Sequence, residues 1–371
     1  MTATPPSREI DARVRELVET APSDAAAATS RLADGGLAVL PHLLAPLRTD
    51  HPIAATERLE AVLKAALAKE FARGPSGEAA REIAAFQRDL GFILKYKSYA
   101  VKASTILGYS VFLQEPAQGF SFQQHLTHKV ELFHILDVPP GGYLFISEFD
   151  EWKAAYKPQT FDAWLSGAAD ANLDRFTCRP APGDLYAIER TGIVHSVIGC
   201  VLEEFATVST DYVDRLHDQN ASRPIPTHFT RTWSEERLKA VRYPSVLSRA
   251  TIDGSGSSRR EAITGVAMRG GRRFSLAAGT FSAARLAVEP GGATELVNTA
   301  DEALSIHCTR GAGQVVIADQ TEIDRMSPPS LSVRQGDLLL VPPGFWYAVS
   351  GDRASGVDVS IHAVRPSLAF K

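Results

Sequence analysis

Apolar residues recur at helical spacing through the first 95 residues of the chain. The apolar face of the first such segment is formed by Ile10, Val14, Leu17 and Val18. Residues 55–74 and 76–91 give two further amphipathic patterns, and each ends at a glycine, the residue that most often follows a helix. Because no cluster of ligand-type side chains occurs in this part of the sequence, we predict a helical N-terminal extension over residues 1–95 that serves packing or dimerisation.

The pattern changes near Tyr96, where β-branched and aromatic residues begin to alternate with polar ones. Gly and Pro then interrupt the chain about every 8–12 residues, a spacing typical of all-β sandwiches and barrels. One helical interruption is predicted near residues 158–175, and a short helix near residues 232–241. The Gly- and Ser-rich run at residues 253–260 is interpreted as a linker or loop.

One pattern occurs twice in this region, at residues 181–197 and at residues 334–349. Each copy has a Gly-Asp turn, an apolar strand, a turn that contains Gly, and another strand. Such an internal repeat predicts two small β-barrels in tandem. We therefore place a first barrel at residues 96–250 and a second at residues 260–371, and the predicted fold class is mainly β.

Composition and charge exclude several classes of protein. The 371 residues are 44% hydrophobic and 22% charged, which is ordinary for a soluble globular protein. The net charge of −4 argues against a nucleic-acid partner, and no apolar run reaches the ~18 residues that a membrane span needs. The N-terminus shows no signal-peptide pattern. The three cysteines are widely spaced, which favours a reducing compartment, so we expect a cytoplasmic protein.

A strand-like run at residues 119–131 carries the polar side chains that bind metals. Gln123 and His125 stand two residues apart, so both face the same side of a strand. Glu131 follows six residues after His125, and His195 comes after the Gly-Asp turn of the first repeat. One carboxylate and two imidazoles suit Zn²⁺, Fe²⁺, Mn²⁺, Co²⁺ or Ni²⁺, and open coordination positions remain for water or substrate. The side chains in this region are therefore of the types that can hold a divalent metal.

These residues also carry a resemblance to a known family. Gly119, His125 and Glu131, followed by a Gly-Asp turn and His195, resemble the two-motif signature of the cupin superfamily. The resemblance implies jelly-roll barrels in which both motifs lie on neighbouring strands and point at one divalent metal. It covers roughly residues 96–371, so the predicted architecture is a tandem pair of cupin barrels behind a helical extension.

A narrower resemblance follows from one departure, because the second histidine of the general cupin motif falls at Thr127. The chain is similar to the type I mannose-6-phosphate isomerases, whose pattern is Ser-x-Gln-x-His, then Lys-x-Glu, then a later His. The matching residues here are Ser121, Gln123, His125, Lys129, Glu131 and His195. Bacterial members of that family carry a second barrel without metal ligands. In this chain the position that matches His195 is Tyr347, so the second barrel is predicted to be metal-free.

The resemblance implies a role for each matching residue. One divalent ion, zinc first with Fe, Mn, Co or Ni as alternatives, would be held by Gln123, His125, Glu131 and His195. His128 takes the place of Gln123 if the strand bulges. Lys129 would lie beside the substrate, and Arg215 would occupy the place of the family's active-site arginine. The family's longer segment between the first two parts of the motif is absent here, so a sugar and a sugar phosphate both stay open as substrates.

Three functions fit this pattern. The first is a metal-dependent aldose–ketose isomerase that acts on a sugar or sugar phosphate through an enediol. The second is a cupin Fe(II)-dependent dioxygenase, because two His and one Glu also suit iron. The third is a sugar-binding cupin without catalysis. The expected partner is a small molecule in each case, and a homodimer stays open.

Three further sites have structural interpretations. His134 lies in an apolar run and is interpreted as a packed core or barrel residue. Glu203 and Glu204 are adjacent, so only one of them can face the barrel interior. Cys200 is interpreted as a small buried apolar residue.

Overall fold

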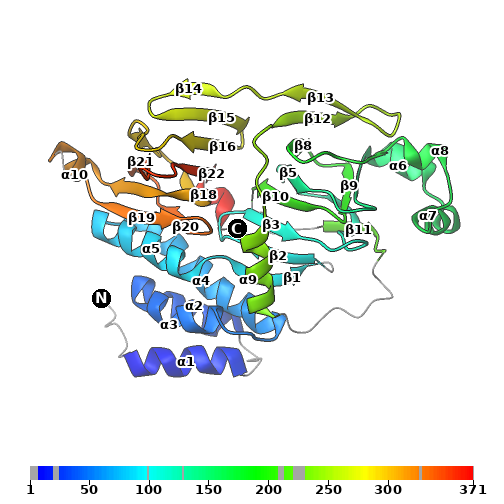
Figure 1. The fold of residues 1–371 in the computed structure, drawn as a ribbon. Coiled ribbons are helices and arrows are strands. Elements are labelled where there is room, and N and C mark those ends of the chain that lie inside the picture. The colour runs from blue at the N-terminus through cyan, green and yellow to red at the C-terminus, as the bar shows by residue number, and fades with distance from the viewer. Residues whose placement is uncertain are drawn as a thin grey trace.

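The computed structural model describes residues 7–19, 25–97, 100–127, 129–207, 213–219, 230–325 and 328–370. Helices form its N-terminal part, and strands form most of the rest (Figure 1). The predicted fold class, mainly β with a helical N-terminal extension, is therefore confirmed. The three cysteines are buried free thiols. Among the described residues, no helix combines the length and the apolar character that crossing a bilayer requires.

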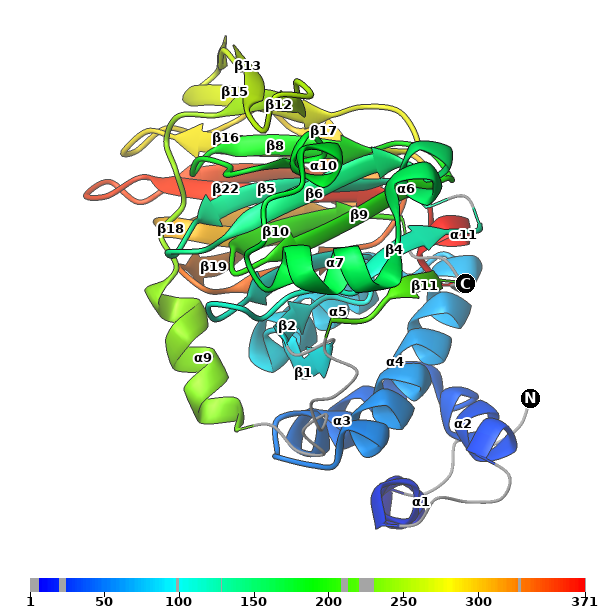
Figure 2. The ribbon, with the colours of Figure 1, turned by 90° about the vertical axis from the view of Figure 1, so that its right-hand side faces the viewer.

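The N-terminal helices form a layer beneath the strands (Figures 1 and 2). They are α1 (Ser7–Glu19), α2 (Ala25–Ala33), a 3-10 turn (Gly36–Val39), α3 (Leu40–Leu47), α4 (Ile53–Arg73) and α5 (Gly77–Leu90). The predicted apolar face of α1 is buried at Ile10, Val14 and Leu17. Helix α5 contributes Ala80 and Ala84 to the core of the second barrel, so the helical layer supports the strands directly.

Two sheets build the first barrel. One has the strand order β1-β2-β3-β10-β5-β8-β12-β13, and the other has the order β11-β4-β9-β6-β7. The strands are β1 (Ile93–Lys97), β2 (Ala100–Ser104), β3 (Tyr109–Leu113), β4 (Phe122–His125), β5 (Glu131–Asp137), β6 (Tyr143–Glu148), β7 (Thr177–Cys178), β8 (Asp184–Ile188), β9 (Ile193–Ile198), β10 (Val201–Ala206), β11 (Val213–His217), β12 (Ser248–Ile252) and β13 (Ser258–Ala262). Phe133 and Leu202 from the first sheet share one apolar core with Leu144 and Val197 from the second. The two sheets therefore face each other across a common interior.

Three short helices cover the outside of the second sheet. They are α6 (Phe149–Ala155), α7 (Pro158–Leu165) and α8 (Ala171–Asp174), and they connect β6 to β7. The Phe161 ring of α7 packs edge-on against Phe122 of β4, with ring centroids 4.9 Å apart. Successive residues of a strand face opposite sides, so this contact directs Gln123 and His125 toward the barrel interior.

The run at residues 253–260 is not a linker, because residues 253–257 form the loop of a hairpin and residues 258–260 begin its second strand. The loop interpretation therefore holds, and the linker interpretation was wrong. Strand β12 pairs with β13 from Ile252 opposite Ser258 to Ser248 opposite Ala262. The Asp253 side chain accepts the Ser255 N–H at 2.9 Å, which makes the Gly- and Ser-rich segment a tight turn. Strand β12 also pairs in parallel with β8, so the hairpin extends the first barrel's larger sheet.

The second barrel is built around one long strand, β18. Its strands are β14 (Val266–Met268), β15 (Gly271–Ala277), β16 (Phe281–Val288), β17 (Val297–Asn298), β18 (Ala303–Ala318), β19 (Ser330–Arg334), β20 (Leu338–Val341), β21 (Trp346–Gly351) and β22 (Val357–Val364), with helices α10 (Gln320–Asp324) and α11 (Pro366–Ala369). The first half of β18 pairs with β20 and β22, and its second half pairs with β19 and β21. One strand thus joins both walls of the barrel, whose interior is filled by apolar side chains.

The two barrels pack against each other through buried polar contacts. The Ser360 hydroxyl of β22 donates to Glu203 of β10 at 2.9 Å, and the Ser305 hydroxyl of β18 bonds to Thr105 at 3.2 Å. Helix α9 (Arg231–Ala240) runs beside the interface, as Figure 1 shows. Its first residue, Arg231, donates to backbone carbonyls of the helical layer, so α9 is tied to that layer as well.

Candidate metal centre

The predicted ligand residues meet inside the first barrel, although they come from both sheets. His125 ends β4 and His195 lies on the neighbouring β9, while Glu131 begins β5 in the opposite sheet. Glu131 Oε2 lies 3.4 Å from His125 Nε2 and 3.3 Å from His195 Nε2. The two imidazole rings are stacked with centroids 5.1 Å apart. One ligand atom from each residue lies within 4.8 Å of the others, a spacing that suits a shared cation.

All three side chains are removed from water. The exposed fraction is 1% for His125, 2% for Glu131 and 0% for His195. Burial raises the pKa of the Glu131 carboxyl, but the Lys129 ammonium and the two imidazoles more than offset this and hold it well below its usual range. Lys129, itself buried, contacts Glu131 Oε1. The carboxylate is therefore ionised in a position where a charge needs close compensation.

The donor set fits a divalent cation. Glu131 Oε2 and His195 Nε2 are buried atoms that make no well-formed hydrogen bond to any other described residue. The other nitrogen of His195, Nδ1, lies 3.1 Å from the carbonyl oxygen of Ile193, which fixes the ring with Nε2 toward Glu131. Lys129 occupies only Oε1 of the carboxylate, so Oε2 stays available to an ion.

The remaining predicted site residues differ in how far their side chains are buried. Gln123 is buried and sits opposite His195 on β9 and opposite Arg215 on β11, so all three share one face of the sheet. The Gln123 Oε1 atom accepts a hydrogen bond from Ser121 at 3.2 Å. Arg215 is exposed on the edge strand β11. His128 lies outside the described residues. Ligation by Gln123 and the role of Arg215 stay predictions.

The structure adds a second buried ion pair that sequence reasoning missed. Lys102 Nζ lies 3.2 Å from Glu204 Oε1, and both side chains are buried. Glu204 pairs with Phe133, two residues from Glu131 on β5, so both carboxylates face the interior. Burial lowers the pKa of the Lys102 amine; the Glu204 carboxylate opposes this shift, and the nearby Lys129 charge adds to it. A lysine flanked by Val101 and Ala103 in strand β2 was the available signal.

The adjacent residues Glu203 and Glu204 face opposite sides of strand β10, as the alternation of side chains along a strand requires. Glu204 faces the interior, while Glu203 faces the second barrel and contacts His134 Nδ1 at 2.6 Å. His134 is buried, which confirms its interpretation as a packed residue. Cys200 is fully buried, as expected. Tyr347 is a buried residue of β21 in the second barrel.

No protein-family model matches the chain, and no curated protein matches it in sequence. Among solved structures, the mannose 6-phosphate isomerase from Bacillus subtilis is 14% identical, with 68% of this chain and 74% of that chain covered and a TM-score of 0.42. The oxalate decarboxylase from Lactobacillus farciminis, solved with formate, is 12% identical over 74% and 84%, with a TM-score of 0.42. Hazelnut vicilin is 12% identical over 76% and 85%, with a TM-score of 0.43. Similarities this distant do not assign chemistry, so the function is inferred from the site itself.

Proposed function

We propose that the first barrel holds one divalent metal ion and catalyses an aldose–ketose isomerisation of a sugar or sugar phosphate. The observation that carries this proposal is the buried Glu131 carboxylate, flanked by two imidazoles on one oxygen and by Lys129 on the other. His125, Glu131 and His195 would hold the ion, with Gln123 as a fourth ligand and zinc as the first choice of metal. When bound, the ion would supply Lewis acidity that stabilises negative charge developing next to a carbonyl group.

The chain's own residues would do the remaining work. Isomerisation moves a proton between two neighbouring carbons. Lys129, buried next to the ligand Glu131, would take this proton in its neutral amine form and return it to the second carbon as an ammonium. Arg215 lies at the exposed edge of the face that holds Gln123 and His195, where a guanidinium can bind an anionic substrate group. The two imidazoles are themselves buried, an environment that would shield the reacting atoms from water.

One observation favours a second candidate, an Fe(II)-dependent oxygenase. The clustered ligand atoms come from two histidines and one carboxylate, which is the set that non-haem iron oxygenases use. The two functions differ in their need for oxygen. An isomerase leaves the oxygen concentration unchanged, whereas an oxygenase consumes oxygen in proportion to product.

Metal analysis of the purified full chain tests the shared part of both candidates. We expect about one equivalent of a divalent metal in the wild type and near-complete loss in Glu131→Gln, because Glu131 is the only carboxylate in the cluster found among the described residues. The matched control is His42→Ala, which removes a histidine of the helical layer that pairs with Asp11 and should leave the metal content unchanged. Full metal content in Glu131→Gln would rule out the proposed centre.

Activity then separates the two candidates. The metal-loaded protein is assayed for isomerisation over a panel of hexoses, pentoses and their phosphates, with oxygen recorded in parallel. Conversion of an aldose to its ketose without oxygen uptake supports the isomerase. Oxygen uptake without isomerisation would contradict the isomerase and support the oxygenase. If neither reaction occurred with any substrate, both catalytic proposals would be wrong and only metal binding would remain.

A further inference from the structure

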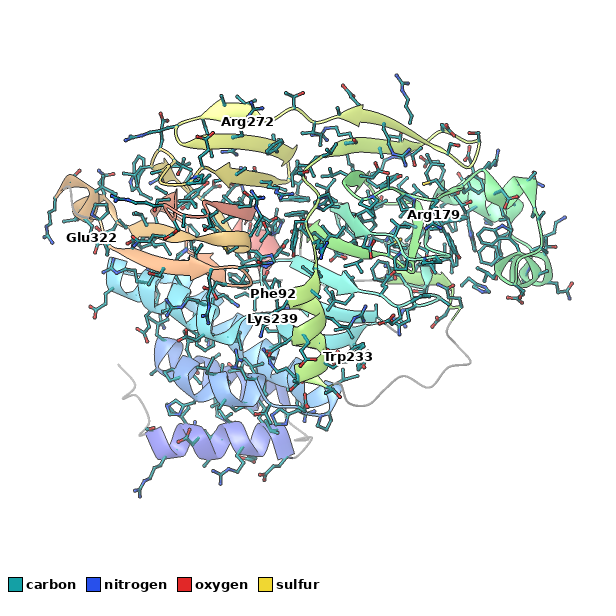
Figure 3. All side chains as sticks on the ribbon, viewed as in Figure 1. Phe92, Arg179, Trp233, Lys239, Arg272 and Glu322 are labelled. Atoms are coloured by element: carbon teal, nitrogen blue, oxygen red, sulfur yellow. The ribbon has the colours of Figure 1, made fainter. Side chains whose placement is uncertain are left out.

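A cleft of about 890 Å³ lies between the helical layer, α9 and the second barrel, and it shares no lining residue with the metal centre. Phe92 contributes from the segment before β1, Lys239 from α9, and His307 from β18. Figure 3 labels Phe92 and Lys239 beside α9. The volume is that of a small-molecule site, and the cleft sits where three parts of the chain meet, as such sites commonly do.

The base of the cleft is formed by a buried histidine. His307 is 2% exposed, and its ring packs edge-on against Phe92, with centroids 5.1 Å apart. The Tyr109 hydroxyl lies 2.8 Å from His307 Nδ1. No hydrogen bond to His307 Nε2 is found within the part of the chain that the structure describes, and this residue lines the cleft. The imidazole is therefore held in place through Nδ1, while Nε2 is available to a ligand in the cleft.

The neighbouring carboxylate decides which nitrogen of His307 carries the proton. Tyr109 donates its hydroxyl hydrogen to Glu203 Oε1 at 2.5 Å. Burial raises the pKa of Glu203, but His134 and Tyr109 outweigh this and lower it, so the carboxylate is ionised and accepts only. The Tyr109 oxygen must then accept the Nδ1–H of His307. Burial also lowers the pKa of His307 to about 4, so its Nε2 is an unprotonated hydrogen-bond acceptor at neutral pH.

The walls of the cleft carry an excess of positive charge. Five basic side chains line it, against three acidic ones, which leaves a surplus of two positive charges. The basic residues are Arg48, Arg88, Arg231, Lys239 and Arg334. Arg231 is already bound to Glu235 and to backbone carbonyls. Lys239 and Arg334 are exposed, and neither forms an ion pair with another described residue. Their charges are the ones that a ligand can neutralise.

We propose that this cleft is a second binding site, which takes a small anion that also carries a hydroxyl group. The hydroxyl donates to His307 Nε2 at the base, and the carboxylate or phosphate lies toward Lys239 and Arg334. An anion without a hydroxyl group would pair with the basic side chains of the walls but leave His307 Nε2 without a hydrogen bond. The hydroxyl is therefore the group that this site recognises specifically. The site is independent of the proposed metal chemistry.

Two matched pairs of probes test this ligand class by calorimetry. Citrate is compared with tricarballylate, which lacks only the hydroxyl, and glycerol 3-phosphate is compared with n-propyl phosphate. The full-length Glu131→Gln variant is used so that chelation at the first barrel does not contribute. We expect saturable binding of citrate or of glycerol 3-phosphate, and roughly tenfold weaker binding of the partner without hydroxyls, as one lost hydrogen bond implies. The pair that binds tells whether carboxylate or phosphate is preferred.

Charge reversal at the walls gives the second test. Lys239→Glu and Arg334→Glu should each weaken binding roughly tenfold. The control is Arg272→Glu, the same charge change at an exposed residue of β15 that Figure 3 labels away from the cleft. His307→Phe, which keeps an aromatic ring but has no hydrogen-bond acceptor, should abolish the preference for the hydroxylated probe.

The proposal is overturned by any of three results. They are the absence of saturable binding for both hydroxylated probes, equal binding of the probes in each pair, and equal weakening by Arg272→Glu. Should His307→Phe fail to fold, the two wall variants and the probe pairs still decide the question.

Discussion

At the scale of single residues, the first barrel is defined by buried charges. Glu131 and Glu204 face inward from one sheet, and each contacts a buried lysine, Lys129 and Lys102 respectively. A buried carboxylate is tolerated only when a cation or hydrogen bonds compensate it. Glu131 is additionally flanked by two imidazoles, which makes it the carboxylate suited to a metal. The Lys102–Glu204 pair has a simpler role, because the two side chains neutralise each other's charge within the barrel wall.

Removing Lys102 tests that role. Lys102→Met leaves the buried Glu204 carboxylate without its cation, and we expect a loss of about 3–5 kcal/mol in the free energy of unfolding. The double variant Lys102→Met with Glu204→Gln should recover part of the loss, because no uncompensated charge remains. Urea denaturation of the full chain measures both.

The control for this prediction is an exposed pair. Arg190 contacts Glu148 on the surface, where the two side chains are 62% and 45% exposed. Arg190→Met should cost at most about 1 kcal/mol, because water screens exposed pairs. A Lys102→Met variant that is no less stable than this control would contradict the prediction.

At the scale of elements, the repeated Gly-Asp turn has a different environment in each barrel. Gly183 and Gly336 both adopt a positive φ, +94° and +92°. A Cβ added at Gly183 would lie 2.1 Å from the carbonyl oxygen of Val246, whereas at Gly336 nothing lies within 4 Å. The first turn is therefore covered by the chain that enters β12, and the second turn is open.

Alanine at the two positions separates backbone conformation from packing. Gly336→Ala should cost about 1 kcal/mol, because only the positive φ opposes a Cβ. Gly183→Ala should cost about 1–3 kcal/mol more, because the added Cβ also displaces the Val246 carbonyl. Thermal and urea unfolding of both variants check the difference, and equal stability would show that the close contact relaxes without cost.

At the scale of the whole molecule, the barrel interface buries groups that titrate. His362 of β22 is fully buried between Phe205 of the first barrel and Phe281 of the second. Neither of its ring nitrogens has a hydrogen-bond partner among the residues that the structure describes. Burial lowers the pKa of His362 from its ordinary value of 6.5 to about 3. Between these two pH values the unfolded chain binds a proton that the folded chain does not.

This difference predicts how stability depends on pH. The contribution of a neutral His362 is complete above pH 6.5 and is lost as the pH falls toward 3. In that window the wild type should lose roughly 1.4 kcal/mol of unfolding free energy per pH unit from this residue. His362→Leu should remove that part of the slope, with His362→Phe as a second variant. Urea denaturation at pH 7, 6 and 5 measures the slopes, and equal slopes in all three proteins would exclude this origin.

The sequence by itself determined much of the candidate site. Helical periods predicted the N-terminal layer, and alternation along a strand, a local property, placed Gln123 and His125 on one face. The motif resemblance added Glu131 and His195, and the structure brings these two together with His125. A local pattern does not state which strands pair. The hairpin of β12 and β13, whose loop lies at residues 253–257, was missed for this reason, since a Gly- and Ser-rich run is typical of turns and linkers alike.

Only the tertiary structure decided which residues from distant parts of the chain contact one another. It placed Glu131 across the barrel from both histidines, paired Lys102 with Glu204 over about a hundred residues of chain, and set Arg215 at the exposed edge of the sheet. It also formed the cleft beside His307, where three distant segments meet. These contacts join residues far apart in the chain, and the free energy that selects them comes from burying whole faces against one another, which no stretch of sequence contains alone.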